Sequence, residues 1–144
     1  MSALRTVYKV WALVIVLGVL AQIGAAGYGA FYAAHRLEDD NSILTHKGWE
    51  HGFDFHGGFG TILVGGMIIL LILGLIARLG RPAIWFPLAL AIAGVIQILL
   101  AELGRSVPAL GWLHPLNALL IAALAGNIAA RQWRPAAAPP APAA

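Results

Sequence analysis

Apolar residues in this chain form four long runs, separated by short groups of polar and charged residues. Each run holds about 20 or more residues, which is the length an α-helix needs to cross a hydrocarbon layer of roughly 30 Å. The pattern therefore predicts an all-α fold, an integral membrane antiparallel four-helix bundle built from residues 1–134. The expected spans lie at about 10–34, 56–77, 82–102 and 109–131.

Composition supports a membrane protein and excludes several other classes. Hydrophobic residues make up 60% of the 144 residues and charged residues only 10%, against about 25% charged in soluble domains. The chain has no cysteine, which excludes disulfides, thiolate metal sites and haem attached through thioethers. Residues 135–144 are only Pro and Ala, so we expect a disordered tail.

Basic residues are distributed unevenly between the two sides of the predicted bundle. Six of the nine Lys and Arg residues fall on the side of the termini and three on the other, together with all six acids. The positive-inside rule therefore predicts that both termini are cytoplasmic. The six are Arg5, Lys9, Arg78, Arg81, Arg131 and Arg134, and the three are Arg36, Lys47 and Arg105. They form no basic block, so a nucleic-acid partner is not expected.

Small residues recur at every fourth position in the first and last spans. This spacing lets helices approach closely, within one chain or between chains. One alternative function is therefore a non-catalytic assembly or structural subunit, or a homodimer, whose ridges bind partner helices. The ridge positions are Ala21, Ala25 and Gly29, then Ala118, Ala122, Gly126 and Ala130. A cleaved signal peptide ending near Gly24 is a further alternative, although the first apolar run exceeds the usual 7–15 residues.

Two histidines stand near the outer ends of the second and fourth spans, which run in the same direction. His56 precedes Arg78 by 22 residues and His114 precedes Arg134 by 20, about 33 and 30 Å along a helix. Two imidazoles at one depth, without Cys nearby, suit the axial positions of a b-type haem. The alternative without a cofactor is that both histidines are interfacial residues that form hydrogen bonds with loops or water.

Neighbouring residues complete the predicted haem site. Gly57 and Gly60 leave room beside one ligand, and Gln97 and Asn117 are candidates for pocket lining or for hydrogen-bond acceptors of the imidazoles. Arg36 and Arg105 are available, with Lys47, to the anionic propionates. Gln22 is interpreted as a hydrogen-bonding residue between helices. The apolar residues expected between the site and the membrane centre are Leu63, Val64, Met67 and Ile121.

A second group of possible ligands precedes the second span. His46, Glu50, His51 and Asp54 lie within nine residues, some of them three or four apart as on one helix face. A metal-binding membrane protein using this outer His-rich loop is the second alternative function. A solvated loop is the commoner outcome of such a pattern, so we predict no tight metal site between residues 35 and 55.

The segments Gln97-Ile-Leu-Leu-Ala-Glu-Leu-Gly and Leu113-His-Pro-Leu-Asn-Ala are similar to the Q-x-x-L-G and L-H-x-x-x-A patterns of haem A synthase. The chain resembles one four-helix half of that family and also small bacterial four-helix membrane proteins. The resemblance implies axial ligation by His56 and His114 and a bacterial plasma membrane. It does not imply oxidation of haem O, because the chain is a single half and Phe53 replaces the family's Glu.

Together these observations predict a cytochrome b-like protein with bis-His haem b. Iron with both axial positions filled offers no site for oxygen or substrate, which favours electron transfer or haem handling over oxygenase chemistry. Whether the chain is an enzyme stays open, since catalysis would need a second haem or a second copy. The expected partners are the lipid bilayer and a redox protein, or a respiratory complex of which this chain is a subunit.

Overall fold

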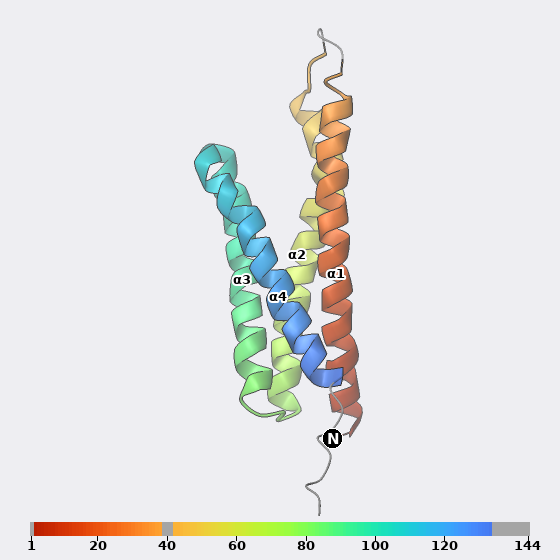
Figure 1. Ribbon diagram of the computed structural model, residues 1–144, viewed down its shortest axis with the longest axis vertical. Helices are drawn as coiled ribbons and strands as arrows, with labels where there is room; N and C mark the ends of the chain where they lie inside the picture. The colour runs from red at the N-terminus through yellow and green to blue at the C-terminus, as the bar shows by residue number, and fades with distance from the viewer. Residues whose placement is uncertain (1, 39–41, 134–144) are drawn as a thin grey trace, which may run out of the picture.

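The computed structural model describes residues 2–38 and 42–133 (Figure 1), and within them the fold is all-helical, with four helices long and apolar enough to cross a membrane. The elements are α1 (Ser2–His35), α2 (His46–Ile76), α3 (Pro82–Ser106), the 3₁₀ helix η1 (Pro108–Trp112) and α4 (Leu113–Trp133). Arg134 and the predicted disordered tail at 135–144 lie outside the described residues.

The second helix begins ten residues before the predicted span. Thr45 caps it, with its hydroxyl oxygen accepting a hydrogen bond of 3.1 Å from the backbone N–H of Gly48. The polar segment that follows is therefore a helical extension of α2, where the sequence analysis expected a loop. The expected span began at residue 56, where the apolar run begins. A helix that is capped and packed against its neighbours can begin earlier, within a polar segment.

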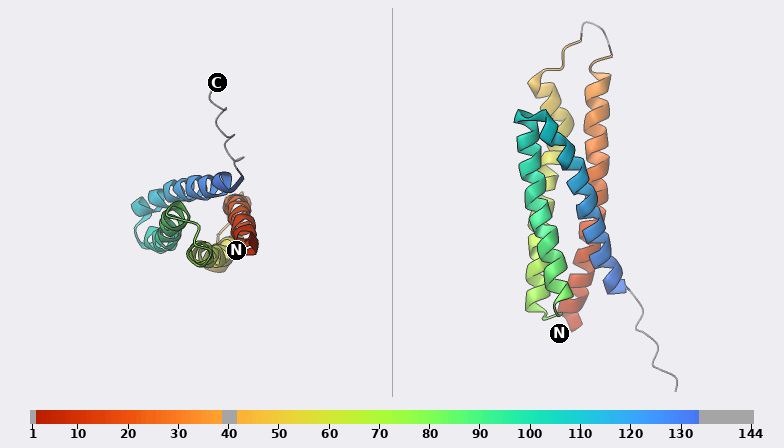
Figure 2. Two further views of the ribbon diagram at one scale, coloured as in Figure 1. Left: turned by 90° about the horizontal axis from the view of Figure 1, so that it is seen from below. Right: turned by 60° about the vertical axis from the view of Figure 1, so that its left-hand side comes forward.

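The helices follow one another around the bundle in an up-down-up-down order. α1 contacts α2 and α4, and α3 contacts α2 and α4, so α2 and α4 lie on one diagonal and run parallel. The view along the bundle shows this ring (Figure 2, left). We call the end with the N-terminus and the α2–α3 turn the proximal end, and the end with η1 the distal end.

Both tight connections depend on glycine. The α2–α3 turn holds Arg78 and Gly80 at φ of 50° and 88°, a region that is accessible to Gly at little cost. At the distal end, a Cβ on Gly104 would lie 2.9 Å from the Cα of Gly111. The absence of side chains there lets η1 fold back against the end of α3.

The buried core fills the proximal and central parts of the bundle. Its fully buried members include Tyr8, Ile15, Met67, Leu70 and Leu90. The indole N–H of Trp11 adds a bond of 2.9 Å to the carbonyl of Gly66. The exterior is apolar as well, with Ile62 72% and Leu119 65% exposed, as expected for helices in a lipid bilayer.

Packing between the two hairpins weakens toward the distal end. No residue from 95 to 120 is buried, and Figure 1 shows the α3–α4 hairpin diverging from α1 and α2 there. The α1–α2 hairpin stays closed, because Gly29 lies directly against Phe53 and the carbonyl of Gly52. The α4 ridge is less used, since a Cβ on Gly126 would meet nothing within 4 Å.

Candidate functional site

The two histidines predicted to lie at one depth are neighbours in the structure. His56 on α2 and His114 on α4 have ring centres 6.2 Å apart, with 64° between the ring planes. Both are partly buried, at the level where the hairpins begin to diverge. The backbones of α2 and α4 stay apart, with no Cα atoms within 8 Å of each other, so these imidazoles meet across the diagonal of the bundle.

Each imidazole is held by a backbone carbonyl of the helix that precedes its own. Nδ1 of His56 lies 3.2 Å from the carbonyl oxygen of Gln22, and Nδ1 of His114 lies 3.1 Å from that of Gln97. Because a carbonyl oxygen only accepts, each Nδ1 carries the proton and donates it. In the neutral ring, Nε2 is then unprotonated and its lone pair is free for a ligand.

The two hairpins repeat this carbonyl contact but fix it with different side chains. In α1–α2, the Gln22 amide donates a bond of 2.9 Å back to the His56 carbonyl. In α3–α4, Asn117 donates 2.7 Å to the side-chain oxygen of Gln97 and 2.8 Å to the Ala93 carbonyl. Each histidine is therefore positioned within its own hairpin.

Two details of the predicted surroundings change. The side chains of Gln97 and Asn117 were candidates for pocket lining or for imidazole acceptors, and the acceptor for His114 is the main-chain carbonyl of Gln97. Gln22 bonds between helices as predicted, and its carbonyl also positions His56. The sequence carries no signal for that second role, because every residue has a carbonyl group.

The two glycines predicted beside His56 have different surroundings. A Cβ on Gly60 would lie 3.0 Å from the amide nitrogen of Gln22, whereas one on Gly57 would meet nothing within 4 Å. Phe53 lies edge-on to the His56 ring, with centroids 6.3 Å apart. The apolar side chains expected on the proximal side of the pair are all buried, namely Leu63, Val64, Met67 and Ile121.

The arginines predicted to face the propionates lie further along their helices. Arg36 follows Gln22 by 14 residues, about 21 Å of helix, and Arg105 follows Gln97 by eight, about 12 Å. Arg105 is 3.7 Å from Glu102 in an exposed ion pair. By this residue count Arg105 is closer to the level of the pair than Arg36, so it is the better of the two candidates.

The distal polar segment forms separate surface contacts. Nδ1 of His46 lies 3.4 Å from a carboxylate oxygen of Glu50, with both side chains exposed. The ring of His51 is 5.5 Å from that of Tyr32. In residues 2–38 and 42–133, no three His, Cys, Asp or Glu side chains gather as a metal ion requires. In this part of the chain, the metal-binding alternative is therefore not supported by a cluster of three ligands.

Comparison with known proteins gives no relative for this chain. No family model, no curated protein and no solved structure matches it.

Proposed function

We propose that this membrane protein binds one b-type haem between α2 and α4, with His56 and His114 as axial ligands, and acts in electron transfer or haem handling. The observation that carries the proposal is the spacing of two imidazoles whose Nδ1 atoms are both anchored. A metal-bound imidazole nitrogen lies about 2.0–2.1 Å from the metal, so two rings on opposite sides of one ion have centres about 6.4 Å apart. The 6.2 Å found here fits that spacing.

A porphyrin fits the donor set better than a bare metal ion. Protein zinc sites use three or four side-chain ligands, whereas only two imidazoles meet here in the described part of the chain. A haem brings four nitrogens of its own and needs two more. On its proximal side the pair adjoins buried apolar side chains. On its distal side the bundle is less packed, and no residue from 95 to 120 is buried.

The chain's residues would orient and tune the iron. The carbonyls of Gln22 and Gln97 hold the imidazole planes and increase their basicity by accepting the Nδ1 protons. The buried side chains of Leu63 and Met67 exclude water from the inner side of the site. When bound, a haem with two axial histidines supplies reversible one-electron transfer and has no open coordination position. This chemistry suits a relay to a redox partner at the distal end.

We further infer that both termini face the cytoplasm of a bacterial cell and that the haem lies in the outer half of the membrane. The support is the excess of Lys and Arg at the proximal end and the placement of the acids at the other. Reporter fusions after Arg81 and after Arg134 should both report a cytoplasmic location. An external readout at either position contradicts this orientation.

The open ridge on α4 favours a second candidate, the non-catalytic subunit. A Cβ added to Gly126 would meet nothing within 4 Å, so this face can accept a partner helix or a second copy. Cross-linking in membranes from a cysteine introduced at Ala130, the exposed position of this ridge, distinguishes the two occupants, because a second copy gives a linked dimer of this chain.

The absorbance spectrum of protein produced with ample haem tests the main proposal. We expect a low-spin b-type spectrum with one haem per chain. His56→Ala and His114→Ala should each lose this spectrum or the pigment, because one axial ligand is missing. The matched control replaces His46 and His51, whose rings are exposed, and should retain the haem. A colourless wild-type protein, or low-spin spectra in both single variants, contradicts the ligand assignment.

A further inference from the structure

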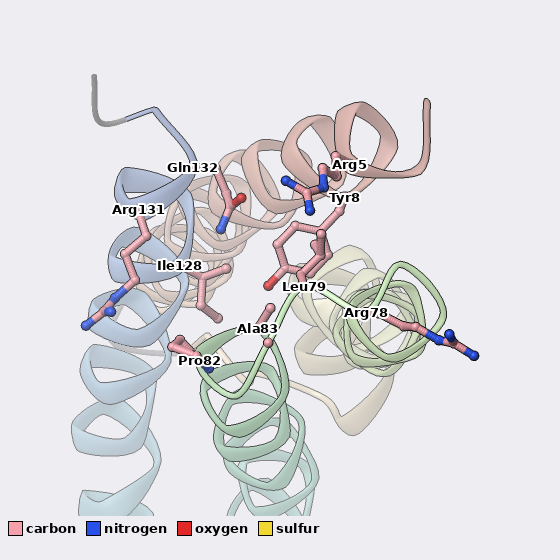
Figure 3. Close-up of a pocket in the computed structure, with 10 residues that line it drawn as sticks. Arg5, Tyr8, Arg78, Leu79, Pro82, Ala83, Ile128, Arg131 and Gln132 are labelled. Carbon is pink, nitrogen blue, oxygen red and sulfur yellow. The ribbon is translucent and has the colours of Figure 1, made fainter. Parts of the chain in front are cut away.

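A pocket of about 620 Å³ opens at the proximal end of the bundle, far from the histidine pair. The start of α1, the α2–α3 turn and the end of α4 enclose it. Its polar lining comes from Arg5, Tyr8, Arg78, Arg131 and Gln132. Figure 3 shows the Tyr8 side chain pointing inward with its hydroxyl toward Ala83, Arg5 and Gln132 near its ring, and the side chains of Arg78 and Arg131 directed outward.

Tyr8 points to a ligand for this pocket. Its side chain is 0% exposed, and its hydroxyl has no hydrogen-bond partner among the described residues. Buried polar groups are almost always hydrogen-bonded, because losing water without a replacement partner is unfavourable. A ligand atom that accepts a hydrogen bond in the pocket would satisfy this hydroxyl.

The charges around the pocket define the sign of that ligand. Arg5 lies in the first turns of α1, where the helix dipole is already positive, and α3 also begins at the pocket with Pro82. The described carboxylates lie at the distal end: Glu38 follows the end of α1, Glu50 and Asp54 lie in the first turns of α2, and Glu102 lies in the last turns of α3. The Arg5 guanidinium therefore stands beside the pocket, with Arg78 and Arg131 at its rim, and no described carboxylate lies there to balance these charges.

We propose that the pocket binds the phosphate of an anionic phospholipid headgroup. The Tyr8 hydroxyl donates to a phosphate oxygen, the Arg5 guanidinium provides charge-assisted bonds, and the Gln132 amide adds a further donor. Basic pockets between membrane helices are known to hold such headgroups. The exposed apolar flanks of the helices would contact the acyl chains. This proposal is independent of haem.

Lipid binding to the delipidated full chain, counted by native mass spectrometry in neutral detergent, tests the proposal. We expect phosphatidylglycerol to bind in preference to phosphatidylcholine. Arg5→Gln should weaken phosphatidylglycerol binding about fivefold, and Tyr8→Phe about two- to tenfold. The control Arg36→Gln removes the same charge at the distal end and should leave the affinity unchanged.

The source of the phosphate is resolved by competition. Inorganic phosphate that displaces phosphatidylglycerol only at far higher concentration supports the lipid headgroup, and displacement at equal concentration assigns the pocket to the free anion instead. Equal binding of the two lipids overturns the proposal. Equal weakening by Arg5→Gln and Arg36→Gln does so as well, since it would reflect general charge attraction. Because Arg5 is exposed, its variant does not depend on refolding of the core.

Discussion

Replacing Tyr8 with phenylalanine removes one hydroxyl and leaves the ring packing in place. In the ligand-free protein this hydroxyl is buried without a partner among residues 2–38 and 42–133, a situation that costs about 1–3 kcal/mol for an unsatisfied polar group. Tyr8→Phe should therefore stabilise the delipidated protein, and we expect the free energy of unfolding to rise by about 1–2 kcal/mol. For a chain of this length, that corresponds to roughly 3–8 °C in Tm.

Anionic lipid should reverse the sign of the effect. When a phosphate accepts from the hydroxyl, the wild-type protein gains a charge-assisted bond that the variant cannot form, so phosphatidylglycerol should raise Tm more for wild type than for Tyr8→Phe. Thermal unfolding followed by circular dichroism measures both values in one neutral detergent. Tyr28→Phe is the control, because Tyr28 is 59% exposed and its hydroxyl is not confined to the core.

One result refutes this reasoning directly. If Tyr8→Phe lowers Tm in lipid-free detergent by more than the Tyr28 control, the hydroxyl makes a favourable bond in the free protein. The pocket then contains no unsatisfied donor that a ligand would need to satisfy.

Two further substitutions test the packing and the histidine site. Gly74→Ala should destabilise the protein by about 1–3 kcal/mol, because the added Cβ would meet the carbonyl of Ala83, whereas Gly65→Ala, with nothing within 4 Å, should have little effect on Tm. Gln97→Leu should keep the low-spin haem spectrum and shift only the reduction potential, because its main-chain carbonyl still holds His114; loss of pigment in this variant would assign the side chain a larger role.

The four helices were predictable because membrane-spanning helices need a minimum apolar length and the charges mark where they end. The depth of His56 and His114 followed from counting residues to basic positions on the opposite side. The start of α2 was not predictable in the same way, since Thr45 caps a polar segment whose packing against Tyr32 depends on the tertiary structure. Main-chain contacts such as the one to Gln22 also leave no pattern in a sequence.

The way each histidine is held has a consequence for the site as a whole. His56 is anchored within α1–α2 and His114 within α3–α4, so local structure fixes each ring but not the distance between them. That distance depends on the angle at which the two hairpins cross, which the core around Met67 and Leu90 determines. A ligand held by both imidazoles would therefore connect the hairpins at the level where their own packing ends.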